Sequence, residues 1–274
     1  MDSKLFSPLA IRGITLKNRI VLSPMLQYCA DNGHVNDWRL MHYGKFAAGG
    51  AGLVFVESTK VDPRGCSTPR DLGLWKDDFI APFKRTDEYG GTPQKRMRFP
   101  LEVVREVRKF WPEHNPLFFR ASAVDEAGWT IKDSIAVARV LKERGVDVID
   151  CSAGGMADAA TSDIARRYGY QVDYARKIKA GAGVDMAVGM IIHADQAEKI
   201  ISTDSADLVA LGREFLHNFN WPIDAAQKLE IKAPFEHASR AYAYWLEKRA
   251  NNKMGIRSST WQRGINVGDD EKAG

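Results

Sequence analysis

The feature that most constrains this fold is a repeated alternation of short apolar segments with amphipathic ones. Apolar, largely β-branched segments centre at about residues 20, 53, 117, 147, 186 and 208. Helical periodicity occupies residues 37–50, 92–111, 131–145, 170–183, 194–205 and 221–230, and residues 7–18 have the pattern of a short hairpin or loop. Strands that are apolar on both faces belong to parallel sheets covered by helices. The pattern therefore predicts an α/β protein with six parallel strands.

Six strands are enough for a doubly wound sheet, whereas a closed barrel of strands and helices needs eight. Both architectures place their chemistry at the carboxyl ends of the strands. In this sequence a polar residue or a glycine stands at each expected strand end, namely Ser23, Glu57, Arg120, Ser152, Gly189 and Gly212. The alternation leaves both architectures open and predicts the functional site at that edge of the sheet.

Composition limits the class of protein. A chain of 274 residues that is 45% hydrophobic supports one large core, so we expect a single domain over residues 1–274. The 39 basic and 35 acidic side chains are interspersed, which disfavours a nucleic-acid partner. Cys29, Cys66 and Cys151 are widely spaced, as in a protein of a reducing compartment without structural zinc. The N-terminus lacks a signal-peptide pattern and no apolar run approaches roughly 18 residues, so we expect a cytoplasmic protein without membrane or metal partners.

Two consecutive strand ends have the character of a phosphate site. The segment "VALGREF" delivers Gly212 and Arg213 at the end of one strand, and "AVGMI" delivers Gly189 at the end of the preceding strand. Glycines expose backbone N–H groups, and a guanidinium pairs well with phosphate oxygens. A tight turn and a surface arginine would explain either segment alone. Because the two follow consecutive strands, together they favour phosphate binding.

A larger set of motifs carries a family resemblance. "LFSPLAIRGITLKNRIVLSPM", "MHYGKFAAGGAGLVFVE", "DPRGCSTPRDLGLW", "RTDEYGGTPQKRMRF", "GVDVIDCSAGG", "GYQVDYARKIK" and "ADLVALGREFL" follow one another along nearly the whole chain. In this order they resemble the Old Yellow Enzyme family of FMN-dependent NAD(P)H oxidoreductases, or ene-reductases, which fold as TIM (β/α)8 barrels. The segment "SPM" with Tyr28 three residues on is similar to the bacterial-type subgroup.

The resemblance implies a role for particular residues. Ser23, Pro24, Met25 and Ser58 would lie beneath or beside the flavin ring, and Arg120 would approach its N1/O2 edge, where positive charge stabilises the reduced anion. The ribityl chain and phosphate would be held by Ser152, Gly154, Gly189, Met190, Gly212 and Arg213. Tyr28 would be the catalytic residue that faces an enone-like small molecule, with NAD(P)H as the reductant.

One stretch departs from the family. In "FKRTDEYGGTPQKRMRF", residues 83–99, the helix that begins near residue 77 runs directly into a turn cluster that the family places much further downstream. At about 30 residues per βα unit, the third and fourth units of the barrel are missing, with a seam near residues 84–86. The expected fold is therefore a TIM-barrel type with about six parallel strands. The gap between Glu57 and Leu117 is either closed by new strand pairing or left open as a cleft.

The missing stretch has chemical consequences. In the family it carries a glutamine that contacts the flavin, an H-x-x-H or H-x-x-N pair that grips the substrate's carbonyl oxygen, and a tyrosine proton donor. The H-x-x-N of this chain, His217–Asn220, follows the wrong strand, and Leu26 stands where the family has cysteine or threonine. We expect His42 to be a packed or surface residue and His193 to lie at the rim.

Three functions follow from the sequence. The first is an FMN-dependent NAD(P)H oxidoreductase of the ene-reductase type, which reduces activated C=C bonds of α,β-unsaturated carbonyls. The second is a catalytically inactive deletion product or interaction protein that retains part of the flavin site. The third, a phosphate-binding α/β isomerase or lyase, is opposed by the continuous family resemblance. Because the missing strands would leave two unpaired sheet edges, pairing into a homo-oligomer also remains open.

Overall fold

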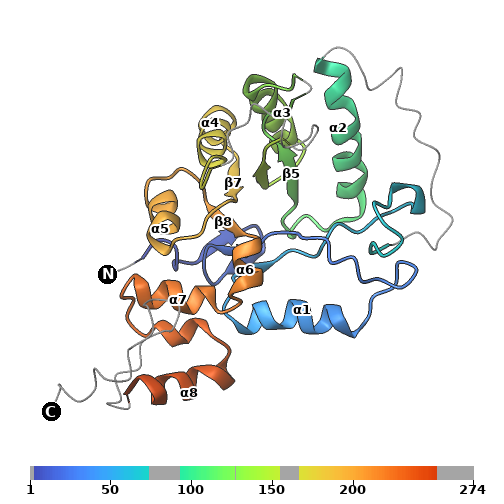
Figure 1. Cartoon of the computed structure of the whole chain (residues 1–274). Helices are drawn as coiled ribbons and strands as arrows, with labels where there is room; N and C mark the ends of the chain where they lie inside the picture. Colours follow the sequence, from blue (N-terminus) through green and yellow to red (C-terminus); the bar gives the residue numbers. More distant parts are fainter. Residues whose placement is uncertain (1–2, 74–92, 127, 155–166, 252–274) are drawn as a thin grey trace.

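The computed structural model describes residues 3–73, 93–126, 128–154 and 167–251 (Figure 1). The predicted seam at residues 84–86 and the helix start near residue 77 lie outside these ranges. Within the described ranges, no helix combines the length and the apolar character that a bilayer crossing requires.

The strands follow the predicted alternation and are β1 (Leu9–Ile11), β2 (Ile14–Leu16), β3 (Ile20–Leu22), β4 (Leu53–Val54), β5 (Phe118–Ser122), β6 (Val148–Ser152), β7 (Asp185–Val188) and β8 (Leu208–Leu211). The helices are α1 (Asp37–Ala48), α2 (Pro93–Phe110), α3 (Ile131–Glu143), α4 (Val172–Ala182), α5 (Ala194–Ser202), α6 (Arg213–His217), α7 (Trp221–Lys228) and α8 (Arg240–Asn251). Two 3₁₀ turns, η1 (Pro63–Gly65) and η2 (Pro234–His237), complete the described elements.

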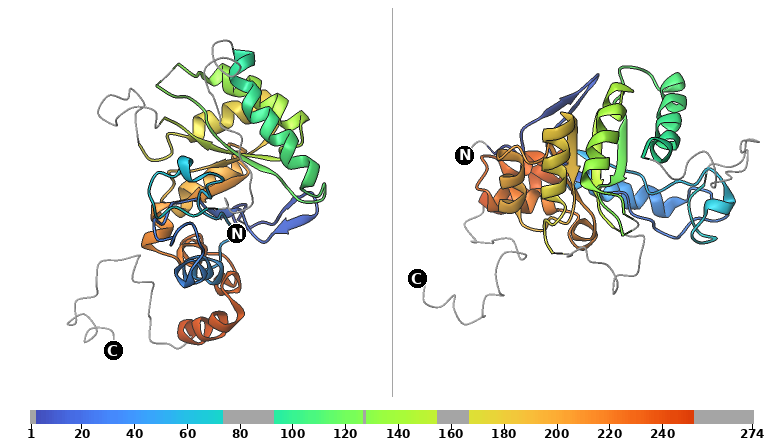
Figure 2. Two further views of the ribbon diagram at one scale, coloured as in Figure 1. Left: turned by 90° about the vertical axis from the view of Figure 1, so that its right-hand side faces the viewer. Right: turned by 90° about the horizontal axis from the view of Figure 1, so that it is seen from above.

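Strands β3 to β8 form one parallel sheet in the order β4-β3-β8-β7-β6-β5, and the sheet curls as part of a barrel wall (Figure 2). Its register pairs Val21 with Leu53 on one side of β3 and Ile20 with Val209 on the other. Strands β1 and β2 form a separate antiparallel hairpin, as predicted for residues 7–18. The expectation of six parallel strands is thus confirmed for the described chain.

The sheet stays open between β4 and β5, which are its two edge strands. Strands β3 and β4, expected near residues 20 and 53, are neighbours, whereas β5, expected near residue 117, pairs with β6 alone in the described chain. Across the opening the rings of Phe55 and Phe118 meet edge to face, with centroids 5.3 Å apart. The gap is therefore a cleft bridged by side chains rather than a new strand pairing.

Side chains alternate between two sides of the sheet. On the helix-covered side, Ile149, Met186 and Leu211 join the large core beneath α2 to α5 (Figure 1). The opposite, concave side holds a second cluster, which consists of Ile11, Leu16, Val21, Val148, Ala187, Leu208 and Ala210. Two of its members come from the hairpin β1-β2, so the hairpin closes the barrel interior at the amino ends of the strands. The carboxyl ends remain accessible.

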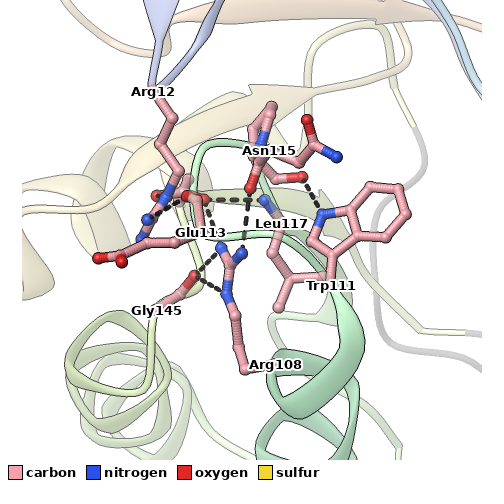
Figure 3. A network of polar contacts seen from close by, with 9 residues as sticks. Arg12, Arg108, Trp111, Glu113, Asn115, Leu117 and Gly145 are labelled. Atoms are coloured by element: carbon pink, nitrogen blue, oxygen red, sulfur yellow. Dashed lines mark hydrogen bonds and ion pairs between the residues drawn. The ribbon is translucent and has the colours of Figure 1, made fainter.

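A polar network fixes α2, the first described helix after the seam, to the amino ends of β5 and β6 (Figure 3). Arg108 Nη2 donates to Asp147 Oδ2 at 2.9 Å, and Arg12 Nε of the hairpin donates to Asp147 Oδ1 at 2.6 Å. The same carboxylate accepts the backbone N–H of Leu117 at 2.8 Å, and Arg108 Nε donates to the carbonyl of Gly145 at 3.0 Å. Asp147 therefore joins the hairpin, α2 and the start of β5.

Several element boundaries differ from the prediction. The strand expected over residues 206–215 ends at Leu211, because Arg213 already begins α6. Helix α8 was not predicted, and none of its residues is buried. The strand expected over residues 51–59 is reduced to two residues in β4. As an edge strand, β4 has a neighbour on one side only, so nothing extends its pairing.

Candidate functional site

A cavity of about 810 Å³ opens at the carboxyl ends of β3, β7 and β8. It brings together most of the residues predicted to bind the cofactor, namely Ser23, Pro24, Met25, Arg120, Gly189, Met190, Gly212 and Arg213. Cavities of this size are typical of cofactor sites. The segments come from distant parts of the sequence and meet because parallel strands align their carboxyl ends at one edge.

Gly189 and Gly212 stand at the strand ends that line the cavity. A Cβ on Gly189 would approach Gln171 Oε1 to 3.0 Å and the carbonyl of Ala210 to 3.5 Å. A Cβ on Gly212 would reach the Met25 sulfur at 3.5 Å. The glycines thus leave backbone and space free for a ligand at the point where sequence reasoning placed a phosphate.

Two arginines give this cavity positive charge. Arg213, the first residue of α6, is exposed, and its Nη2 lies 3.7 Å from the Met190 sulfur. We expected Arg120 at the end of its strand, but it lies within β5. Its side chain is 45% exposed. It forms an ion pair with Asp150, its register partner on β6. Arg120 lines this first cavity, whereas Asp150 does not.

Asp150 is an unusual partner because it is only 2% exposed and its Oδ1 has no hydrogen-bond partner. Burial raises the pKa of this carboxyl, and the positive charge of Arg120 offsets part of the rise. The next residue, Cys151, is also buried, and burial raises the pKa of its thiol to about 12. The cysteine therefore lines the cavity as an unreactive thiol.

A second cavity of about 550 Å³ lies at the open side of the sheet. Tyr28 and Ser58 line it, and Pro24, Met25 and Arg120 belong to both cavities. The aromatic pair Phe55 and Phe118 also lines this second cavity, as do Leu26, Val56 and Asp150. The two cavities therefore meet at residues 24 and 25 and at Arg120, and Tyr28 faces the second one.

Residues 4–85 and 79–232 match the family described as NADH:flavin oxidoreductase / NADH oxidase. The chain belongs to this family. The match comes as two segments that meet at residues 79–85, where the sequence predicted a seam. The resemblance to the Old Yellow Enzyme family and the barrel type of the fold are confirmed, and the family depends on FMN.

Solved structures of similar fold include several members of this FMN oxidoreductase family. Morphinone reductase is 17% identical, with 83% of this chain and 90% of that chain covered and a TM-score of 0.64. The Old Yellow Enzyme homologue from Zymomonas mobilis is 16% identical, with 82% and 93% covered and a TM-score of 0.66. A 2-naphthoyl-CoA reductase in complex with 2-naphthoyl-CoA is 16% identical, with a TM-score of 0.74; 82% of this chain but only 52% of that chain is covered.

The first cavity fits FMN, the cofactor of the family. Its lining has the chemistry that FMN requires, because Gly189 and Gly212 carry no side chain and Arg120 and Arg213 supply positive charge. Two predicted cofactor residues, Ser152 and Gly154, line neither of the two cavities. They instead bond to the segment around the end of β5: Ser152 O accepts from Ala123 N at 2.8 Å, and Gly154 N donates to Val124 O at 2.9 Å.

Sequence reasoning missed Gln171 as a cavity residue. Its side chain is buried between Gly189 and Tyr170, whose OH accepts from Gln171 Nε2 at 3.1 Å. The motif "GYQ" was part of the family resemblance, but a glutamine at the start of a helix carries no distinctive signal of its own.

No histidine of the described chain lines either cavity. His42 is buried against Tyr43 and Phe46, and burial lowers its pKa, so it is a packed residue. His193 is exposed next to α5, as expected of a rim residue, and His217 is exposed at the end of α6. The one H-x-x-N segment therefore lies away from the cavities, in agreement with its position in the sequence.

Proposed function

We propose that this chain is an FMN-dependent NAD(P)H oxidoreductase in which Gly189, Gly212 and Arg213 hold the flavin phosphate. The observation that carries the proposal is the convergence of these residues with Met25 and Arg120 on one cavity. The ring would lie against residues 23–25, and Arg120 would stand at its pyrimidine edge. Bound FMN supplies the redox chemistry of the reaction, because it accepts hydride from a nicotinamide and passes it on.

The chain's own residues prepare the site for that chemistry. The positive charge of Arg120 favours negative charge on the ring, and the partial exposure of its side chain leaves it able to face the ring. Asp150 holds Arg120 from the buried side, which orients the guanidinium. Tyr28 and Ser58 would form one side of the substrate cavity, with the aromatic rings of Phe55 and Phe118 on the other.

The ligands of similar structures support a small-molecule substrate and a nicotinamide reductant. One morphinone reductase structure is a complex with tetrahydroNAD, the naphthoyl-CoA reductase holds an aromatic thioester, and an Old Yellow Enzyme from Trypanosoma cruzi binds pHBA. For this chain we propose an enone-like substrate in the cavity beside Tyr28. The open edges β4 and β5 support the second candidate, an inactive or oligomeric protein with only part of the flavin site.

FMN titration tests the proposal. Replacement Arg213→Ala removes one charge-assisted phosphate contact and should weaken FMN binding by about 1.5–3 kcal/mol, or roughly 10- to 150-fold. Flavin fluorescence during titration gives the dissociation constant. Arg176→Ala is the matched control, because that arginine is an exposed helix residue paired with Asp173 and remote from the cavity lining. Equal affinities of the parent and Arg213→Ala would remove Arg213 from the site.

NAD(P)H oxidation separates the two candidate functions. A flavin that is bound and reducible should give oxidation of NAD(P)H by oxygen that depends on added FMN and saturates with it. A protein that binds FMN without any such oxidation, or one that binds none, would favour the second candidate. Sedimentation at several concentrations would then show whether the open sheet edges bring two copies together.

A further inference from the structure

The short segment that carries Tyr28 is held on both sides by polar contacts. Before it, the backbone N–H of Gln27 donates to Glu57 Oε2 at 3.0 Å. After it, the carbonyl of Cys29 accepts from Asn36 Nδ2 at 2.7 Å. The N–H of the residue before the tyrosine and the carbonyl of the residue after it are thus each bound to a different part of the chain.

Arg39 of α1 connects these two anchors. Its Nε donates to Glu57 Oε1 at 2.8 Å, and its Nη1 donates to Asn36 Oδ1 at 3.4 Å. Tyr43, one turn further along α1, accepts the backbone N–H of Glu57 at 2.9 Å. Arg39 and Glu57 are each only 2% exposed. The contacts form a continuous network from α1, through the segment after β4, to the segment after β3.

Tyr28 itself has a conformation that needs such support. Its φ is 51°, in the left-handed region that residues with a Cβ disfavour. Strained residues of this kind persist only where their surroundings over-determine them, and they concentrate at functional sites. Tyr28 is 46% exposed and lines the second cavity together with Ser58 and Arg120. The strain therefore accompanies a side chain directed into a cavity.

The network is a poor device for stability alone. Arg39 Nη2 is buried without a hydrogen-bond partner, and a buried ion pair generally stabilises a fold no better than apolar residues of similar volume. Its effect is geometric, because it fixes the backbone on both sides of one residue. The same polar groups would be a costly way to pack α1 against the sheet.

We propose that Asn36, Arg39 and Glu57, here named the Tyr28 clamp, are positioning residues that hold Tyr28 in its left-handed conformation so that the phenol faces the substrate cavity. What the phenol faces rests on the proposed function. The clamp itself is formed without any ligand, so it can be tested separately.

Fluorine NMR of protein containing 3-fluorotyrosine tests the clamp without flavin. The chain has eight tyrosines, and the Tyr28 signal is the one that Tyr28→Phe removes. Arg39→Met should shift the Tyr28 and Tyr43 signals, and Asn36→Ala, at an exposed position, should shift the Tyr28 signal toward that of the denatured chain. Asp147→Asn, which breaks a polar network at the opposite end of the strands, should leave the Tyr28 signal in place. An unchanged Tyr28 signal in Asn36→Ala and Arg39→Met would overturn the proposal, and if Arg39→Met does not fold, Asn36→Ala decides.

Ligand binding to the FMN-loaded protein tests the consequence for the cavity. Asn36→Ala should raise the dissociation constant of 2-cyclohexenone, read from the flavin absorbance spectrum, by about tenfold, the equivalent of one lost hydrogen bond. In a Tyr28→Ala background the same replacement should have no effect, because the clamp acts through the tyrosine. An equal loss in both backgrounds would overturn the positioning role. A chain that binds no FMN contradicts the proposed function, while the fluorine spectra still decide the clamp.

Discussion

The central strands of the sheet and the strands at its open edge differ in how many neighbours support them. Strand β7 lies between β6 and β8, and Met186, Ala187 and Val188 are fully buried. On the open side, β4 is two residues long and only partly buried, and β5 has a single neighbour. A parallel strand gains its burial from neighbours on both edges and from helices on its face. Loss of one neighbour therefore leaves the strand more exposed without changing its direction.

The residues of the candidate functional site are divided between the same two regions, the central strands and the open edge. Gly189, Gly212 and Arg213 stand at the ends of the well-supported strands β7 and β8. Tyr28 and Ser58 line the cavity at the open side. If the site binds FMN, its phosphate end belongs to the intact part of the barrel and its substrate end to the part that lacks strands.

Enone reduction should show the largest effect. No histidine of the described chain lines either cavity, and we expect the pair that polarises the carbonyl in the family to be missing together with the third and fourth βα units. Loss of such a donor costs about 10²–10³ in rate, by analogy with an oxyanion-hole contact. We expect reduction of 2-cyclohexenone near background while NAD(P)H oxidation by oxygen is measurable. Rapid enone turnover by this chain, free of other flavoenzymes, would show that another group, first of all Tyr28, replaces the pair.

The same replacement of valine by alanine in a central strand and in an edge strand measures how differently the two strands are packed. Val209 on β8 is fully buried, whereas Val54 on β4 is partly buried. Val209→Ala should lower the free energy of unfolding by about 2–3 kcal/mol, from lost burial and a residual cavity, and Val54→Ala by about 1 kcal/mol. Urea denaturation of both variants provides the comparison. Equal losses would mean that the open side is packed as tightly as the closed one.

The polar network around Asp147 should contribute more to the free energy of unfolding than its position near the surface suggests. Asp147 accepts from Arg12, Arg108 and the Leu117 backbone, so it fixes α2 beside the open edge (Figure 3). Asp147→Asn should cost about 2 kcal/mol, because two partly buried guanidinium groups lose their counter-charge. Asp173→Asn, whose partners are exposed on α4, should change stability by less than about 1 kcal/mol. If the two variants are equally stable, the network does not anchor α2.

The smallest expected effect is the pH dependence of the free energy of unfolding that two histidines produce. Burial lowers the pKa of His42, behind the Tyr28 segment, and of His237, next to Phe6. Each histidine therefore binds its proton more readily in the unfolded chain, and stability falls as pH drops below about 6.5. The slope is at most about 1.4 kcal/mol per pH unit for each proton. His42→Gln and His237→Gln should each reduce this slope in chemical denaturation between pH 7 and 5. A parent slope of zero would contradict the burial argument for both.

The alternation of apolar strands and amphipathic helices was sufficient to predict the parallel sheet and most of its elements. Residues such as Val148 and Leu208 are buried because every position of a covered parallel strand is apolar, and that pattern is local in the sequence. Phosphate-site candidates were predictable for a related reason. Gly189 and Gly212 follow directly from their strands, so their place at the sheet edge is fixed by chain direction alone.

Contacts between distant segments were not predictable in this way. Asp150 gains its ion pair with Arg120 only from the register of β5 on β6, and Glu57 meets Gln27 and Arg39 only after α1 packs beside β3 and β4. Likewise, the seam predicted missing strands but left two outcomes for the gap. Most of the elements, their direction and the glycines at the strand ends were predictable, because these depend on local pattern. Tertiary structure alone decided that the gap stays open and that Tyr28 is held over it, because both depend on how far a curled sheet brings its two edge strands together.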